Sequence, residues 1–126
     1  MDLSLVYGNS DAQNRPIRAF QGGRLAVAER NGYEWPPQAQ NASASCDVQE
    51  NDEICYQTGD VRTNQNPGLA ILQIILMREH NRIADVLQHL NSHWSDELTF
   101  QEARRINIAQ YQQISYYEWL PIFLGI

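Results

Sequence analysis

The chain has 126 residues, the size of one ordinary domain with a modest hydrophobic core. Hydrophobic residues make up 43% of it and charged residues 19%, a balance that excludes wholesale disorder. The formal net charge is −6, all nine cations are arginines and no basic block occurs, so nucleic acid is not an expected partner. The longest apolar run, residues 69–77, is far shorter than the roughly 20 residues of a bilayer span, and we expect no membrane-spanning helix.

The first part of the chain reads as short elements joined by turns. Residues 2–7 alternate polar and apolar side chains, which predicts a short extended segment ended by a turn. Asn9 or Ser10 then caps a short helix that runs to about Ala19. Residues 23–28 are expected to be extended again.

A polar stretch follows at residues 30–58, and it shows no sustained helical or strand period. It is therefore expected to be a long surface loop. Cys46 and Cys55 lie nine positions apart in it, a spacing that permits a local disulfide but leaves two free thiols equally open. Asn41 begins an Asn-Ala-Ser glycosylation sequon, which favours a secreted protein.

The second half of the chain carries two helical patterns. Pro67 suits the first turn of a helix with Asn66 as its cap, and apolar residues at helical spacing predict a helix over residues 67–90. Its segment 71–77 is apolar nearly all round, so it should be buried against more than one neighbour. Together with the helix described next, this pattern predicts a mainly α fold.

The second helix is expected to begin with a capping box formed by Thr99 and Glu102. It should run to about Trp119 and stop before Pro121. The fold class is therefore mainly α, with two long helices, one long loop and short extended segments.

Few constellations of catalytic residues are present. His80 lies in the mid-helix cluster 78–82, which lacks the paired-histidine spacing of a zinc site and is interpreted as a set of structural ion pairs and hydrogen bonds. The GxSxG, Walker, GxGxxG and CxxC motifs are all missing from the sequence, which excludes the common hydrolase, NTPase, dinucleotide and thioredoxin signatures.

Five segments nevertheless resemble the animal haem peroxidase family, in the family's order and with compatible separations. They are SLVYG from residue 4, GDVRTNQNPGL from residue 59, REHNRIA from residue 78, LNSHWSDELTFQEARRI from residue 90 and YYEWLPIFLG from residue 116. The second segment is most similar to insect chorion peroxidases and peroxinectin-like members. The resemblance implies that residues 1–126 are an internal fragment, the central part of a mainly helical domain several times longer.

The resemblance assigns roles to two residues near the start of the long helix. Arg62 matches the arginine that stabilises negative charge while hydrogen peroxide is cleaved, so it is the predicted catalytic residue. Gln65 falls where many relatives carry a glutamate esterified to the haem. Because an amide lacks the carboxylate nucleophile, haem b is expected to be held without that ester.

Asp2 and Ser4 match two ligands of the family's structural calcium site, and oxygen donors on one side of an extended segment suit Ca²⁺. In the family, a distal histidine takes a proton from hydrogen peroxide and a proximal histidine ligates the iron. Both belong to segments that this sequence does not contain. None of His80, His89 and His93 matches either of them. The chain alone is therefore not expected to bind haem productively.

The implied function is a secreted peroxidase that reduces hydrogen peroxide and oxidises small phenols or protein tyrosines. The alternative is a peroxidase-like adhesion or matrix-binding module that has lost catalysis. Arg62 favours the enzyme, because an adhesive surface has no need of that cation.

Overall fold

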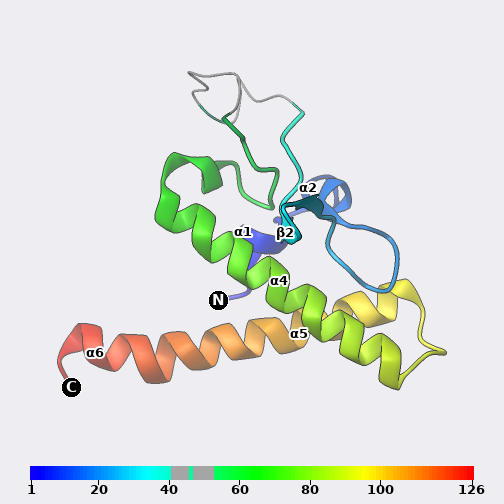
Figure 1. Ribbon diagram of the computed structural model, residues 1–126. Helices are drawn as coiled ribbons and strands as arrows, with labels where there is room; N and C mark the ends of the chain where they lie inside the picture. Colours follow the sequence, from blue (N-terminus) through cyan, green and yellow to red (C-terminus); the bar gives the residue numbers. More distant parts are fainter. Residues whose placement is uncertain (41–45, 47–52) are drawn as a thin grey trace.

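The computed structural model describes residues 1–40, 46 and 53–126. Two long helices, α4 (Pro67–Leu90) and α5 (Asp96–Gln113), cross each other and form its frame, with the N-terminal segments packed over α4 (Figure 1). The helical course of α5 continues through a π-helical turn, η3 (Ile114–Trp119), into α6 (Leu120–Leu124). The fold is mainly helical, as predicted. No helix in the described part of the chain is both long and apolar enough to cross a membrane.

The N-terminus is helical rather than extended. Residues Ser4–Tyr7 form α1, so the prediction of an extended segment over residues 2–7 is wrong. Leu3, Val6 and Tyr7 are all buried, and their spacing of three and four residues suits a helix as well as the alternation suits a strand. The tertiary contacts of these side chains therefore decide the conformation.

The next helix is shorter than predicted. Ser10 caps α2 (Asp11–Asn14), and its hydroxyl accepts from the backbone N–H of Gln13. A 3₁₀ turn, η1 (Arg15–Ile17), follows at once because Pro16 lies inside it. The helical course thus ends two residues before the predicted Ala19.

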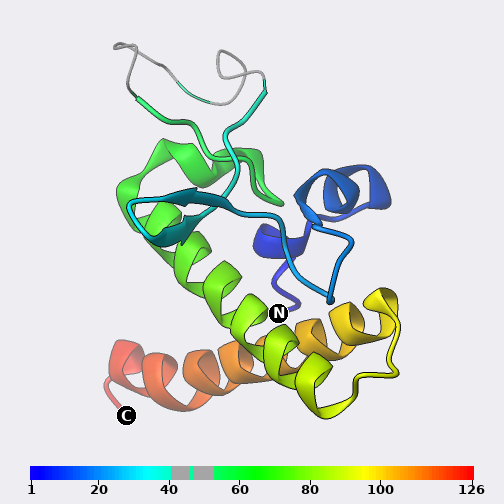
Figure 2. The same cartoon turned by 45° about the vertical axis from the view of Figure 1, so that its right-hand side comes forward.

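The predicted long loop contains a β-hairpin in its first part. Strands β1 (Ala28–Arg30) and β2 (Tyr33–Trp35) pair antiparallel, while residues 23–27 are mostly irregular. Asn31 and Gly32 join the strands with φ angles of 53° and 75°, the conformation that an Asn-Gly hairpin turn requires. The hairpin lies against α4 (Figure 2), where Nε of Arg78 donates to the carbonyl of Glu34 over 2.7 Å.

Helix α4 has the predicted bounds. The side chain of Asn66 caps it by accepting from the N–H of Gly68 over 2.7 Å. One face is buried through residues such as Ile74 and Met77, but Ile71, Leu72 and Ile75 are each more than half exposed. The described part of this chain therefore does not supply the second neighbour that was expected for segment 71–77.

The N-cap of α5 lies four residues before the predicted cap, Thr99. Ser95 is the actual cap, and its hydroxyl accepts from the N–H of Leu98 over 3.2 Å. Thr99 is fully buried inside the first turn, where its hydroxyl donates to the carbonyl of Ser95. The helical course also passes Pro121, which lies in the first turn of α6 directly after the π-helical turn η3.

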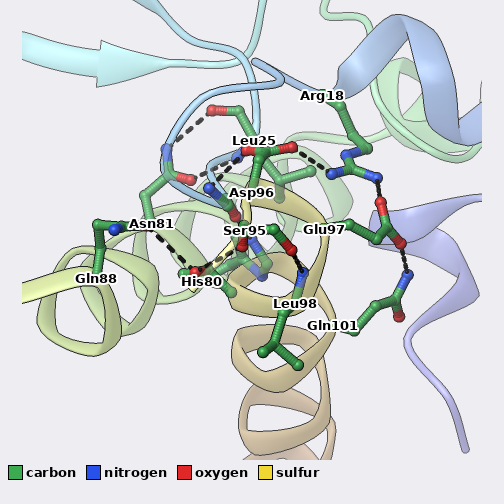
Figure 3. Close-up of polar contacts among 12 residues, drawn as sticks. Arg18, Leu25, His80, Asn81, Gln88, Ser95, Asp96, Glu97, Leu98 and Gln101 are labelled. Atoms are coloured by element: carbon green, nitrogen blue, oxygen red, sulfur yellow. Dashed lines mark hydrogen bonds and ion pairs between the residues drawn. The ribbon is translucent and has the colours of Figure 1, made fainter. Parts of the chain in front are cut away.

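The polar cluster of α4 holds the fold together, as its interpretation predicted (Figure 3). The amide of Asn81 accepts from the N–H of Leu25 and donates to its carbonyl, over 2.8 and 3.1 Å. At the start of α5, the carboxylate of Asp96 accepts from the N–H of Gly23 and from Nη2 of Arg18, both over 2.7 Å. These contacts fix the loop before the hairpin across both long helices.

His80 lies at the centre of a buried hydrogen-bonded chain. Nδ2 of Asn107 donates to the hydroxyl of Tyr7 over 2.9 Å, this hydroxyl lies 2.9 Å from Nδ1 of His80, and Nε2 of His80 lies 2.8 Å from the carbonyl of Gly23. Because a carbonyl only accepts, Nε2 carries the proton and Nδ1 accepts from Tyr7. The imidazole is therefore neutral, and burial lowers its pKa to about 4.

We expect mild acid to destabilise the protein through His80. Between pH 6.5 and about pH 4 the unfolded state binds a proton at this residue and the folded state does not, so the free energy of unfolding falls with falling pH. From pH 6.5 to pH 5 we expect urea unfolding to show a loss of about 1–2 kcal/mol. His80→Gln removes the titrating group, and its stability should hardly change in this window. An equal slope in both proteins would contradict the prediction.

Candidate functional site

The predicted catalytic arginine lies in a short 3₁₀ turn just before α4. This turn, η2 (Val61–Gln65), is capped by Asp60, whose carboxylate accepts from the N–H of Arg62 over 2.8 Å. The next residue, Asn66, ends η2 and caps α4 in turn. The sequence therefore places Arg62 at a fixed distance from the start of the long helix.

At Gly59, the backbone just before this turn packs closely against the end of α1. A Cβ atom at Gly59 would lie 2.3 Å from the backbone N of Gly8 and 2.6 Å from the carbonyl oxygen of Val6. No side chain fits in that space, so only glycine lets the two backbones approach so closely.

Side chains of the turn tie it to the preceding strand-like segment. The hydroxyl of Thr63 is buried, lies 2.5 Å from the hydroxyl of Thr58, and also lies 2.9 Å from the carbonyl of Asp60. The amide of Asn64 accepts from the N–H of Tyr56 and donates to its carbonyl, over 2.8 and 2.9 Å. The backbone that carries Arg62 is therefore held from both sides.

The side chain of Arg62 extends into solvent, where it is 63% exposed, and it pairs with Asp60. Nε donates to Oδ1 over 2.9 Å and Nη2 donates to Oδ2 over 2.8 Å. These hydrogen bonds lower the pKa of Asp60 and raise the pKa of Arg62. Both groups stay charged at every physiological pH.

Arg62 and Gln65 line one groove of about 290 Å³. The rest of its lining is largely apolar and includes Leu69, Leu72 and Leu76 of α4. An apolar wall beside a permanent cation fits a flat, largely apolar cofactor that carries or develops negative charge. The structure therefore brings together the two residues that were predicted to lie beside haem.

The two predicted calcium ligands are adjacent but are not arranged as on an extended strand. Oδ1 of Asp2 accepts from the N–H of Ser4 over 3.1 Å, and this hydrogen bond lowers the pKa of the carboxyl. Ca²⁺ takes six to eight oxygen ligands. Among the described residues no group of three or more His, Cys, Asp or Glu side chains is placed to hold a metal ion. Asp2 and Ser4 alone therefore do not make a site.

The three histidines do not lie in the groove. Both ring nitrogens of His80 are occupied within the core, so this side chain has no position free for iron. His89 and His93 are exposed around the far end of α4.

The predicted disulfide and glycosylation positions lie in the polar loop. Cys46 and Cys55 are joined as a disulfide, with Cα atoms 6.2 Å apart. Asn41 lies outside the described residues, so its role as a glycosylation site remains a prediction.

Asp60 is the residue of this site that sequence reasoning missed. An acid two positions before Arg62, at the start of a turn, is a typical capping signal and could have been recognised. Its second role, the paired contact with the guanidinium, depends on side-chain conformation and leaves no signal in the sequence.

The chain is similar to known proteins over its whole length. The family model described as animal haem peroxidase matches residues 1–126. The chain is 68% identical to a peroxidase of Drosophila melanogaster and 49% identical to its chorion peroxidase, with 99% of this chain aligned in each case. It spans only 18% and 15% of those two relatives.

The similarity extends to the fold of solved structures. Peroxidase A from Dictyostelium discoideum superposes with a TM-score of 0.83 at 33% identity, over 95% of this chain and 24% of that one. A fatty acid alpha-dioxygenase of Oryza sativa, with a TM-score of 0.71 and 22% identity, shares the fold. The chain therefore belongs to the animal haem peroxidase family.

Proposed function

We propose that residues 1–126 are the central segment of a longer haem peroxidase that reduces hydrogen peroxide and oxidises phenolic or tyrosyl donors. The observation that carries the proposal is the position of Arg62, a permanent cation beside an apolar groove that also contains Gln65. Family membership and relatives named as peroxidases support it. The same relatives do not favour an adhesion module without catalysis.

In this proposal haem, when bound, supplies the iron centre at which peroxide is reduced. Arg62 donates hydrogen bonds to the peroxide oxygen on which negative charge accumulates as the O–O bond breaks. Its planar fork of donors and its constant charge suit that role better than a lysine would. Leu69, Leu72 and Leu76 would exclude water from the groove and so strengthen the interaction.

Gln65 would contact the haem edge without forming an ester, because its amide has no carboxylate oxygen to attack the haem substituent. Haem would therefore be bound non-covalently at this position. Histidines on the two sides of the iron would come from parts of the longer protein, since His80 is engaged in the core.

The calcium site and the compartment are further parts of the proposal. Asp2 and Ser4 would contribute two oxygen ligands to Ca²⁺, and the remaining ligands would come from other segments. The disulfide between Cys46 and Cys55 supports secretion, because such bonds persist mainly in oxidising compartments. The sequon at Asn41 is consistent with that location.

The test is Arg62→Gln in the full-length protein that contains this sequence. We expect the second-order rate constant for the reaction with hydrogen peroxide to fall about 100-fold. Removal of one hydrogen-bond donor to a developing oxyanion has an effect of this size in other enzymes. Haem content should be unchanged, and Arg62→Lys should give an intermediate rate. Stopped-flow absorbance measures the rate constant.

Arg105→Gln is the matched control, because this arginine is exposed and pairs with Glu102 away from the groove. It should react with peroxide like the wild type. If Arg62→Gln retained the full rate constant with normal haem content, the catalytic role of Arg62 would be refuted.

A further inference from the structure

We propose that Asp60 is a positioning residue that holds the guanidinium of Arg62 in the orientation needed for peroxide. This inference rests on the proposed function. Asp60 takes one edge of the guanidinium through Nε and Nη2, over 2.9 and 2.8 Å. A guanidinium has five N–H donors, so Nη1 and the outer N–H of Nη2 remain available to a ligand on the opposite edge.

Asp60 is the partner that the described residues provide for the side chain of Arg62. The side chain is 63% exposed, and no other described residue accepts a hydrogen bond from its guanidinium. A free arginine side chain has rotamer entropy that would be lost whenever it bound peroxide. The contact with Asp60 meets part of that cost before the ligand arrives.

Asp60 itself is held firmly. Its side chain is only 12% exposed, and its carboxylate also caps η2 through the N–H of Arg62. Its carbonyl lies 3.0 and 2.9 Å from the hydroxyls of Thr58 and Thr63, which lie 2.5 Å from each other in the same hydrogen-bonded group. With Gly59 pressed against α1, the carboxylate is a fixed point and the guanidinium is the part that it orients.

The contact between Asp60 and Arg62 also has an electrostatic effect, which opposes the benefit of positioning. A carboxylate beside Arg62 reduces the net positive potential that a developing anion meets. If this damping dominated, removing the charge of Asp60 would accelerate the peroxide reaction. If positioning dominates, removing it slows the reaction, so the sign of the change decides between the two roles.

The experiment uses Asp60→Asn in the full-length holoenzyme. Asparagine keeps the capping acceptor for the N–H of Arg62 and loses the charge and the second acceptor. We expect the rate constant for peroxide to fall on the order of tenfold, because misplacing a catalytic group by about 1 Å has effects of that size or more. The dissociation constant of fluoride on the ferric protein, read from the Soret band, should rise by a similar factor. The donor-oxidation rate and haem content should not change.

Glu79→Gln is the matched control, because Glu79 binds Arg82 with the same two-bond geometry, at 2.8 Å each, away from the groove. It should leave both measurements unchanged. If Asp60→Asn lost haem, Asp60→Ser would replace it, since serine also caps a helical turn but offers no fork to the guanidinium. The serine variant should show the same tenfold effects.

An unchanged or faster peroxide reaction in a haem-replete Asp60 variant would overturn the inference. Arg62→Gln separates this failure from failure of the proposed function. If Arg62→Gln slows the reaction and the Asp60 variants do not, only the positioning role is wrong. If Arg62→Gln has no effect either, the catalytic assignment itself fails.

Discussion

Replacing His80 with leucine is expected to lower the free energy of unfolding by about 4 kcal/mol. The substitution keeps a side chain of similar bulk but removes both ring nitrogens. The hydroxyl of Tyr7 still accepts from Asn107 but loses the acceptor of its own proton, and the carbonyl of Gly23 loses its donor. Each buried donor or acceptor left unsatisfied costs about 1–3 kcal/mol. The ring contact with Phe100, at 5.1 Å between centroids, is lost as well.

Urea unfolding of the purified protein measures this effect. His89→Leu is the control, because His89 lies on the same helix with an exposed side chain, and surface changes of this kind usually stay within about 0.5 kcal/mol. If His80→Leu cost no more than His89→Leu, the buried chain from Asn107 to Gly23 would not contribute to stability.

His80 also shows which of its contacts could be predicted from the sequence and which could not. The composition of the cluster at residues 78–82 indicated hydrogen bonds and ion pairs, and His80 and Asn81 make such hydrogen bonds. The identity of the partners could not be predicted, because Tyr7 is 73 positions away and Gly23 is 57 positions away. Only the packing of α1 and of the loop before the hairpin on α4 brings them to the imidazole.

Elements with strong local signals were predicted well. The bounds of α4 follow from Asn66 and Pro67, which act within one turn of the helix start. The hairpin was missed although Asn31 and Gly32 carry its turn signal, since the surrounding polar composition outweighed it.

Elements that depend on tertiary packing were predicted poorly. The conformation of α1 is decided by the burial of its side chains, and its sequence suits strand and helix alike. The start of α5 was misplaced because Ser95 and Thr99 both precede plausible first turns. Burial of Thr99 against the N-terminal segments selects Ser95 as the cap.

The candidate site also combines features that the sequence indicated with features that depend on tertiary packing. Arg62 and Gln65 were identified from a resemblance of sequence, and the groove that contains both depends on the approach of η2 to α1 and α4. Gly59 is the residue on which that approach depends. In the sequence it looked like an ordinary turn former, because the backbone atoms that it faces belong to residues 6–8.

Gly59→Ala is therefore expected to cost about 4 kcal/mol of unfolding free energy, more than the usual 1–3 kcal/mol of an overpacked core. The new Cβ would lie 2.3 and 2.6 Å from backbone atoms of Gly8 and Val6, which no side-chain rotation can relieve. Either α1 or the turn must move. Movement of α1 would pull Tyr7 away from His80, and movement of the turn would displace Arg62.

Gly22→Ala is the matched control, because a Cβ at Gly22 meets nothing within 4 Å. Its φ of +61° limits the cost to the strain of a left-handed alanine, about 1 kcal/mol. Urea unfolding should separate the two variants by about 3 kcal/mol. Full-length Gly59→Ala that still binds haem should also react more slowly with peroxide, whereas Gly22→Ala should not. Equal stability of the two variants would mean that the backbone at Gly59 can move away from α1 at little cost in free energy. This contact would then not fix the position of Arg62.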